Sequence, residues 1–443
     1  MNQKKMGYIV KKDEVRPELM KELDVTPMVF GSFGGKKPES FRLYQEEEDK
    51  YIVPKFWAIE RMRGGEPFLY DSAGSLITAE FIGELRDYQQ EVADAVLPKI
   101  RETGGGIISL PCGDGKTCLA IYLMTQLKLK TLVICHKNFL VNQWIESIKK
   151  FSNATIGRIQ QNTVDVEGKD VVIGMLQSLS KKDYHHSILD QFDLVIFDEV
   201  HNVATKCFSK VLAKLYCRYT IGLSATPHRD DGLSKVFHWY LGDMLFKRTR
   251  AKDSGVTVQL LGFSPKGNFH PKFREIRNNK GDVNLSLMLS NVAGIQERNE
   301  KIIESLVEIL RKEPSRNVLV LSSRIDQLES MKKMFEGSGY TSDFYVGKMK
   351  EAQLKIAQER QVLFATYEMV NEGFDLPKLN TLVMATPRSK IEQAVGRILR
   401  ARSEAAPPLI VDVVDALPIF KNQSAKRNTW YRGRGYKIIT MGS

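Results

Sequence analysis

The chain has 443 residues, which is long enough for two to four domains that each bury a core. Hydrophobic residues make up 42% of it and charged residues 27%, a globular composition that excludes wholesale disorder. The formal net charge of +12 favours a polyanionic partner such as nucleic acid, and the alternative is a basic enzyme without one.

The five cysteines are scattered and form no Cys-x-x-Cys pair, so neither a zinc site nor a disulfide framework is indicated. The sequence has no apolar run of 18 residues and no segment shaped like a signal peptide. We therefore expect an intracellular protein, in the cytoplasm, the nucleus or a viral factory or virion, with no membrane among its partners.

Residues 1–80 mix short alternating stretches with Gly and Pro breaks, which predicts a small β-containing accessory domain. They hold 13 Lys and Arg residues against 14 Asp and Glu residues, so the basic excess belongs to the rest of the chain.

Residues 81–245 alternate apolar strands with helical stretches, which predicts a parallel sheet with helices on both faces. The expected strands are Gly106–Leu110, Thr131–Cys135, Asp170–Gly174, Leu194–Phe197 and Tyr219–Leu223. The expected helices are Tyr88–Arg101, Gly115–Leu127, Asn138–Phe151 and Phe208–Tyr216.

Residues 246–284 are polar and basic and are predicted to form a linker with one strand, Val256–Phe263. The strand and helix alternation returns over residues 285–443 and predicts a second α/β domain. Its expected strands are Asn317–Ser322, Gln361–Ala365, Thr381–Ala385 and Leu409–Val414. Its expected helices are Leu285–Lys312, Arg324–Glu336 and Ser389–Ala401.

A phosphate-binding loop follows the first strand of residues 81–245 and opens a helix. Residues 110–117 read LPCGDGKT, with Leu110 where the strict pattern has Gly. Glycines let backbone N–H groups close around phosphates, Lys116 can reach the β and γ oxygens, and Thr117 can ligate Mg²⁺. The loop residues expected to line a nucleotide are Gly113, Asp114, Gly115, Lys116 and Thr117.

Two carboxylates end a later apolar strand, at the sheet edge where ligands bind in α/β folds. Asp198 can hold Mg²⁺, and Glu199 can orient and deprotonate an attacking water. Ser224 and Thr226 follow the next strand, where they can hydrogen-bond His201 or the Asp198 region and transmit the nucleotide state.

Two arginines lie in the expected helix Ser389–Ala401. Arg397 and Arg400 are three residues apart and share one helix face, with Gln393 in register. Arginines aimed from a second domain can stabilise charge on a transferring γ-phosphoryl group.

In this order, the motifs resemble those of the superfamily two helicases and translocases, over residues 85–415. The resemblance implies two tandem RecA-like domains with an ATP cleft between them, and ATP and Mg²⁺ as cofactors. The loop start Leu-Pro-Cys-Gly and the run Asp198-Glu-Val-His201 are similar to one branch of that superfamily. It contains the XPB transcription and repair translocase, phage branch-migration helicases and the late-transcription helicases of large DNA viruses.

The resemblance also implies further site residues. Gln89 would read adenine, and Gly373 and Asp375 would face the nucleotide together with Gln393. Arg229-Asp-Asp231 resembles the Arg-Glu-Asp element of XPB-like proteins, with Asp in place of Glu. The candidate nucleic-acid contacts by motif position are His136, Lys137, Gln177, Arg229, Arg324 and Thr366.

The residues after Pro418 are basic, lack acidic side chains and carry interleaved aromatics at Trp430, Tyr431 and Tyr436. They can form a stacking and phosphate patch, or an amphipathic cap with the aromatics inward. We favour the cap.

These features predict a nucleic-acid-stimulated ATPase, a monomeric DNA helicase or translocase acting in transcript release, recombination or repair. The resemblance implies DNA and 3′ to 5′ movement. The alternatives are an RNA helicase and the motor subunit of a restriction-type nuclease complex, whose nuclease would be a separate partner. A non-catalytic scaffold is disfavoured because Lys116, Asp198, Glu199, Arg397 and Arg400 are all present.

Overall fold

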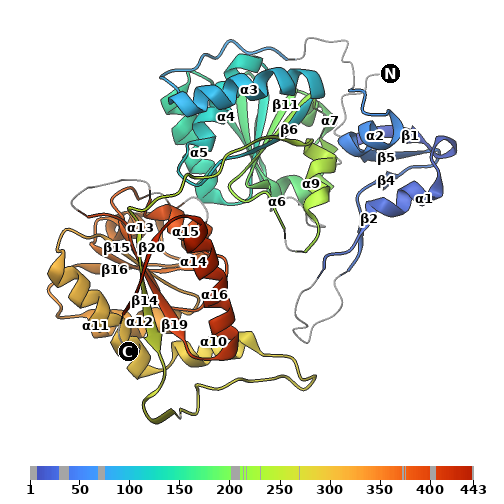
Figure 1. The fold of residues 1–443 in the computed structure, drawn as a ribbon. Helices are drawn as coiled ribbons and strands as arrows, with labels where there is room; N and C mark the ends of the chain where they lie inside the picture. Colours follow the sequence, from blue (N-terminus) through green and yellow to red (C-terminus); the bar gives the residue numbers. More distant parts are fainter. Residues whose placement is uncertain are drawn as a thin grey trace. The chain divides into compact units, whose positions relative to one another are not determined.

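The fold is seen in a computed structural model of the chain (Figure 1). The structure describes residues 7–28, 39–67, 75–200, 210–212, 214–215, 217–229, 231–268, 270–371, 374, 376–399 and 406–441. The chain divides into two compact units, and each is described by itself. The first comprises Met1–Phe30 and Lys36–Thr249, and the second comprises Gly31–Gly35 and Arg250–Ser443.

An eight-stranded sheet forms the centre of the first unit, in the order β13-β6-β12-β11-β7-β10-β8-β9. Neighbouring strands run parallel except for β8 and β9. The strands are β6 (Gly105–Ser109), β7 (Thr131–Cys135), β8 (Ile156–Gln160), β9 (Thr163–Asp165), β10 (Val171–Met175), β11 (Leu194–Asp198), β12 (Tyr219–Ser224) and β13 (Met244–Lys247). The central strands are buried on both faces, which explains why they are continuous apolar runs in the sequence.

Helices cover both faces of this sheet. One core joins it to α3 (Asp87–Thr103), α4 (Lys116–Leu127) and α5 (Asn138–Phe151). A second core joins the other face to α6 (Leu176–Lys181), α7 (His186–Leu189) and α9 (Ser234–Leu241). In α5 the buried stripe has helical spacing, which fixes the face that packs on the sheet. Its members are Leu140, Val141, Trp144 and Ile148.

Residues 7–28 and 39–62, here called the appendage, belong to the first unit (Figure 1). Their sheet has the antiparallel order β1-β5-β4, beside a short β2-β3 ribbon. The elements are β1 (Gly7–Lys11), η1 (Lys12–Glu14), α1 (Pro17–Met20), η2 (Lys21–Leu23), β2 (Asp24–Val25), β3 (Phe41–Arg42), β4 (Gln45–Glu46), β5 (Lys50–Pro54) and α2 (Lys55–Met62).

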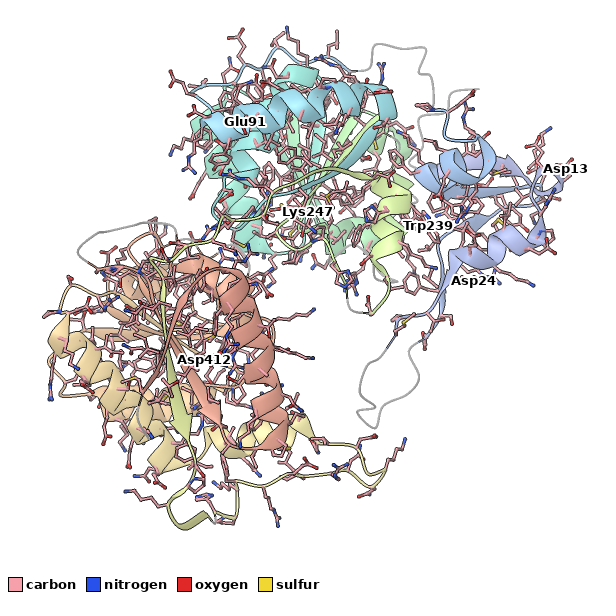
Figure 2. The ribbon with its side chains drawn as sticks, viewed as in Figure 1. Asp13, Asp24, Glu91, Trp239, Lys247 and Asp412 are labelled. Atoms are coloured by element: carbon pink, nitrogen blue, oxygen red, sulfur yellow. The ribbon has the colours of Figure 1, made fainter. Side chains whose placement is uncertain are left out.

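The appendage shares the core beneath α9. Trp57 of α2 is fully buried there, in the same cluster as Phe237 and Trp239 of α9 (Figure 2). Lys55 is buried as well, and its Nζ donates to the backbone oxygens of Gly104 at 3.2 Å and Arg218 at 2.8 Å. These contacts make the appendage an integral part of the first unit.

The second unit has a seven-stranded parallel sheet in the order β16-β17-β15-β18-β19-β14-β20. Its strands are β14 (Thr257–Phe263), β15 (Val318–Ser322), β16 (Ser342–Tyr345), β17 (Val362–Thr366), β18 (Thr381–Met384), β19 (Leu409–Asp415) and β20 (Lys437–Met441). β14 lies in the stretch 246–284 that the sequence pattern assigned to a linker, yet it pairs inside this sheet.

Helices cover this sheet on both faces too. α11 (Gln296–Lys312) and α12 (Ile325–Phe335) share one core with the sheet. The other core receives α13 (Glu351–Gln358), α14 (Tyr367–Asn371), α15 (Glu392–Arg397) and α16 (Pro418–Gly433). α10 (Leu285–Ala293) packs on a smaller cluster with Phe263 and Phe420, and η4 (Lys266–Asn268) follows β14.

The structure confirms the predicted architecture of two parallel α/β sheets with a small N-terminal β-containing region. The single helix expected over Leu285–Lys312 is wrong, because the helix ends at Gly294 and a new one begins at Gln296. Among the described residues, none of the helices combines the length and apolar character needed to cross a membrane.

The C-terminal segment forms the cap. Tyr431 and Tyr436 are buried in the core of the second unit. Arg427 of α16 donates to both carboxylate oxygens of Asp412 at 2.8 Å each, beneath the helix (Figure 2). The aromatics of this segment therefore face inward.

Candidate active site

Most of the predicted motif residues of the first unit lie along one edge of its sheet, at the carboxyl ends of neighbouring strands. The P-loop follows β6, Ser224 ends β12 beside it, and Asp198 ends β11 beside β12. Next in the sheet is β7, followed by His136 and Lys137, and then β10, followed by Gln177. Along this edge, the sheet order therefore gives the P-loop first, then Ser224, then the carboxylates, and then the candidate nucleic-acid contacts.

The P-loop turns through two glycines in the left-handed region, Gly113 with φ 89° and Gly115 with φ 71°. The φ of Gly115 favours glycine, and a Cβ there would lie 2.5 Å from Nε2 of Gln89, so a larger residue would displace the Gln89 side chain. That Nε2 donates to the backbone oxygens of Asp114 and Gly115, both at 3.2 Å, while Oε1 accepts from the N–H of Arg86. Gln89, expected to read adenine, therefore also braces the P-loop backbone.

Lys116 begins α4, and its Nζ lies 3.8 Å from Oε1 of Glu199 and 3.5 Å from the backbone oxygen of Leu110. Glu199 has φ 53°, a left-handed conformation that a non-glycine residue adopts at a cost. Ser224 Oγ donates to Oε2 of Glu199 at 3.4 Å and accepts from the N–H of Thr226 at 3.1 Å. The structure brings these predicted catalytic and coupling residues together, whereas His201 lies outside the described residues.

Asp198 is a half-buried carboxylate beside a second carboxylate. Burial, and then the charge of Glu199, raise the pKa of Asp198 to about 6, while a hydrogen bond from Trp144 and the charges of Lys116 and His136 oppose the rise. Trp144 Nε1 donates to Asp198 Oδ2 at 2.9 Å. Asp198 and Glu199 supply hard oxygen donors that suit Mg²⁺, because a cation would relieve the repulsion between the two carboxylates.

In the second unit, the structure describes only some of the residues predicted to be catalytic or to face the nucleotide. Arg397 is buried, and its guanidinium donates to the backbone oxygens of Val370 and Phe374, both at 2.8 Å. Gln393 is half-buried near the start of α15. Three predicted residues lie outside the part of the chain that the structure describes, namely Gly373, Asp375 and Arg400.

Comparison with known proteins decides the family. The family described as "Type III restriction enzyme, res subunit" matches residues 82–229, and "Helicase conserved C-terminal domain" matches residues 301–402. The "Putative ATP-dependent RNA helicase L396" of Acanthamoeba polyphaga mimivirus is 33% identical over 450 residues, covering 98% of this chain and 85% of the viral protein. The chain belongs to the superfamily two helicases.

Two further similarities bear on this helicase. The "DNA 3'-5' translocase XPB2" of Sulfurisphaera tokodaii is 25% identical, covering 86% of this chain and 92% of that protein. The solved structure "S. cerevisiae Dbp5 bound to RNA and ADP BeF3" matches with a TM-score of 0.56 at 11% identity, covering 88% and 94% of the two chains. The structural likeness supports the RecA-like fold of the units.

The nucleic-acid candidates of this helicase make defined contacts. Gln177 Nε2 donates to the backbone oxygen of His136 at 2.7 Å, and Lys137 is the N-cap residue of α5. Arg229 makes a two-pronged ion pair with Asp231. In the second unit, Arg324 donates to the side chains of Ser286 and Ser290 on α10, and Thr366 is buried at the end of β17.

Arg248, which lies just after β13, belongs to none of the sequence motifs. Its N–H donates to Ser109 at the end of β6. Its guanidinium carbon lies 3.9 Å from the ring centroid of Tyr88, and Nη1 lies 3.7 Å from Oδ2 of Asp114. Tyr88 in turn donates its hydroxyl to the backbone oxygen of Asp114 at 3.0 Å. Arg248 therefore contacts the P-loop from the strand beside it, a position that no motif marks.

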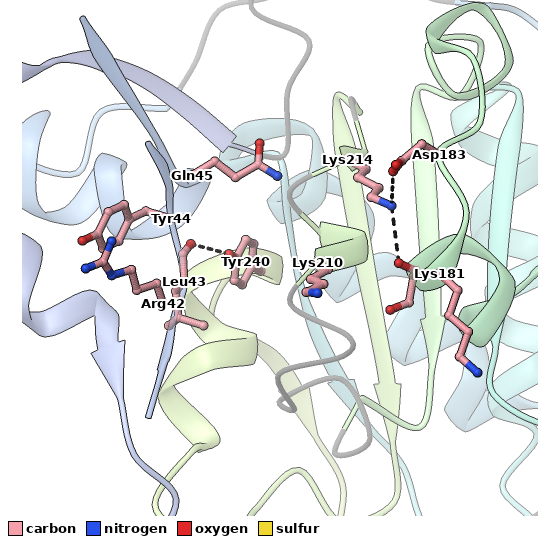
Figure 3. A pocket seen from close by; sticks show the side chains of 10 residues that line it. Arg42, Leu43, Tyr44, Gln45, Lys181, Asp183, Lys210, Lys214 and Tyr240 are labelled. Atoms are coloured by element: carbon pink, nitrogen blue, oxygen red, sulfur yellow. Dashed lines mark hydrogen bonds and ion pairs between the residues drawn. The ribbon is translucent and has the colours of Figure 1, made fainter. Parts of the chain in front are cut away.

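A cavity of about 460 Å³ opens where the appendage meets the rest of the first unit (Figure 3). Cations outnumber carboxylates in its lining, but Lys214 is held by Asp183 at 2.6 Å and by three backbone oxygens. Tyr240 donates its hydroxyl to the backbone oxygen of Leu43 across the same seam. None of the predicted site residues lines this cavity, so it is separate from the candidate active site.

Proposed function

We propose that this helicase hydrolyses ATP with Mg²⁺ and couples hydrolysis to movement along nucleic acid, with DNA as its track. The observation that carries the proposal is the row of groups at one sheet edge, centred on the 3.8 Å approach of Lys116 to Glu199. An ammonium placed for phosphates beside a carboxylate placed for water is what phosphoryl transfer to water needs.

In this proposal the P-loop N–H groups and Lys116 bind the β and γ phosphates. Thr117 and Asp198 would hold Mg²⁺, which neutralises phosphate charge when bound. Glu199 orients the attacking water and accepts its proton, and its contact with Ser224 holds the carboxylate in place.

The second unit is proposed to contribute to the same reaction. Arg397 and Arg400 would stabilise charge on the transferring phosphoryl group, with Gln393, Gly373 and Asp375 facing the nucleotide. The hydrogen bonds from Arg397 to Val370 and Phe374 give this arginine an additional role, since they fix the backbone at these two residues.

DNA is proposed as the track because of the similarity to an archaeal DNA translocase over most of both chains. The Arg229–Asp231 pair, which resembles an element of XPB-like proteins, supports the same choice. A role in transcript release or repair follows as part of this proposal. The second candidate is an RNA helicase, which the printed name of the mimivirus relative favours.

A motor subunit of a restriction complex is the remaining alternative. It is favoured by the family description that matches residues 82–229. Co-purification with an endonuclease, followed by cleavage of DNA that depends on Lys116, would support this alternative over a motor that acts alone.

The proposal is tested by steady-state ATP hydrolysis measured with no nucleic acid, single-stranded DNA, duplexes with either overhang, forked DNA and RNA of the same sequence. We expect strong stimulation by DNA and loss of hydrolysis in Lys116→Ala and Glu199→Gln. Lys149→Ala, an exposed lysine on α5, is the matched control and keeps its rate. Hydrolysis that is indifferent to every nucleic acid contradicts the proposal, and stimulation by RNA alone selects the second candidate.

A further inference from the structure

Trp144 is a buried aromatic whose polar atom faces the candidate site. It is 2% exposed and belongs to the apolar stripe of α5 that packs on the sheet. A phenylalanine would also place an aromatic ring in this stripe, but its ring is smaller and carries no N–H. Nε1 donates to Oδ2 of Asp198 at 2.9 Å, across the short gap between α5 and the end of β11.

This bond occupies one oxygen of the carboxylate that is proposed to hold Mg²⁺. Among the described residues, no side chain or backbone group hydrogen-bonds Oδ1 of Asp198. A single fixed donor on Oδ2 restricts rotation of the carboxylate. Outer hydrogen bonds of this kind orient metal-binding carboxylates in proteins and tune their affinity.

The helix that carries Trp144 also leads to the candidate nucleic-acid contacts. α5 begins at Asn138, immediately after His136 and Lys137. The backbone oxygen of His136 is held by Gln177, which follows β10. A displacement of this end of α5 would therefore change the distance between Nε1 of Trp144 and Asp198, because a helix moves largely as one body.

We propose that Trp144 is a positioning residue, which orients the Asp198 carboxylate through its indole N–H and links that carboxylate to the nucleic-acid end of α5. The inference deepens the proposed function and rests on it for the identity of the cation. It assigns no contact between Trp144 and substrate.

A matched pair of variants tests the orienting role. Trp144→Phe keeps an aromatic side chain, removes the N–H and reduces the buried ring volume. Trp57→Phe makes the same change in the appendage, where Nε1 donates to Oε2 of Glu22 at 3.3 Å. We expect Trp144→Phe to raise the Mg²⁺ concentration for half-maximal hydrolysis, and the dissociation constant of Mg²⁺·ADP, by about tenfold. Trp57→Phe should leave both unchanged.

Intrinsic fluorescence gives a readout that needs no hydrolysis. The chain has four tryptophans, so the difference between the emission of the wild type and that of Trp144→Phe reports Trp144. We expect this difference emission to change when Mg²⁺·ADP binds, and again when DNA is added. Asp198→Asn should abolish the response to Mg²⁺·ADP while nucleotide binding is verified separately by calorimetry.

Two results would overturn the inference. One is a Mg²⁺ dependence of hydrolysis in Trp144→Phe equal to that of the wild type. The other is a Trp144 emission that changes neither when Mg²⁺·ADP binds nor in Asp198→Asn. If Trp144→Phe does not fold, the emission of Asp198→Asn against the wild type decides alone. Absence of ATP hydrolysis in the wild type would instead contradict the proposed function, so the two failures are distinguishable.

Discussion

The candidate catalytic cations of the two units have different partners. In the first unit, Lys116 lies 3.8 Å from the Glu199 carboxylate. In the second unit, Arg397 of α15 is buried and donates to two backbone oxygens of its own fold. The first unit therefore pairs its cation with a side chain at the candidate phosphate site. The second unit holds a cation that fixes the backbone around it.

The largest effect expected from this contrast is at Glu199. Glu199→Gln removes the proposed base while keeping nearly the same shape, so hydrolysis should fall by about a thousandfold with ATP binding retained. Single-turnover hydrolysis and calorimetric nucleotide binding measure the two quantities. A rate within a few-fold of wild type would show that Glu199 is not the base.

In contrast to Glu199, Arg397 should contribute mainly to the stability of the fold. Arg397→Ala removes two buried hydrogen bonds to backbone oxygens, so the free energy of unfolding of the second unit should fall by about 3 kcal/mol. Urea unfolding measures this change, with the exposed Arg311→Ala as the control. An unchanged unfolding free energy together with lost hydrolysis would make Arg397 purely catalytic.

The buried Lys55 of the appendage is a third cation, and its contribution to stability should depend on pH. Burial lowers the pKa of Lys55 from 10.5 to about 8. Between these two values the unfolded chain binds more protons than the folded chain, so the stability contributed by this group rises with pH.

The measurement is urea unfolding of wild type and Lys55→Met across this window. The wild type should gain about 2 kcal/mol relative to the variant between about pH 7.5 and about pH 9.5. Parallel pH profiles for the two proteins would show that Lys55 is charged in the folded state at all these pH values.

The smallest effect is expected at Arg248. Its contacts with Tyr88 and Asp114 are partly exposed, so Arg248→Ala should weaken ATP binding by about threefold, through a less ordered P-loop. Equilibrium binding of a fluorescent ATP analogue measures it, with Arg250→Ala as a control two residues away. Tighter binding in Arg248→Ala would mean that Arg248 instead obstructs the site.

The bounds of helices and strands were predicted best where the sequence pattern matches the burial of the side chains. Thr131–Cys135 and Asn138–Phe151 have the predicted bounds, because a short continuous apolar run indicates a buried strand and an amphipathic stripe has helical periodicity. β20 was missed because its residues are largely exposed and lack an apolar pattern. The break before Gln296 was missed because apolar periodicity continues across Gly294.

At the candidate site, the P-loop and the carboxylates could be predicted because they follow buried strands of one sheet. The partners of Arg397 could not, since backbone oxygens leave no mark in the sequence. The bond from Trp144 to Asp198 was missed for a related reason. The apolar stripe of α5 shows that Trp144 is buried, but only the folded structure shows that its N–H points at Asp198.

The most direct test of the motor claim is displacement of a third strand from a DNA triplex, followed in a gel with wild type and Glu199→Gln. A translocase that moves along duplex DNA strips the third strand only while ATP is hydrolysed. We predict displacement by the wild type with ATP, and none by Glu199→Gln or with a non-hydrolysable analogue. A wild type that hydrolyses ATP on DNA yet leaves the triplex intact would contradict the account.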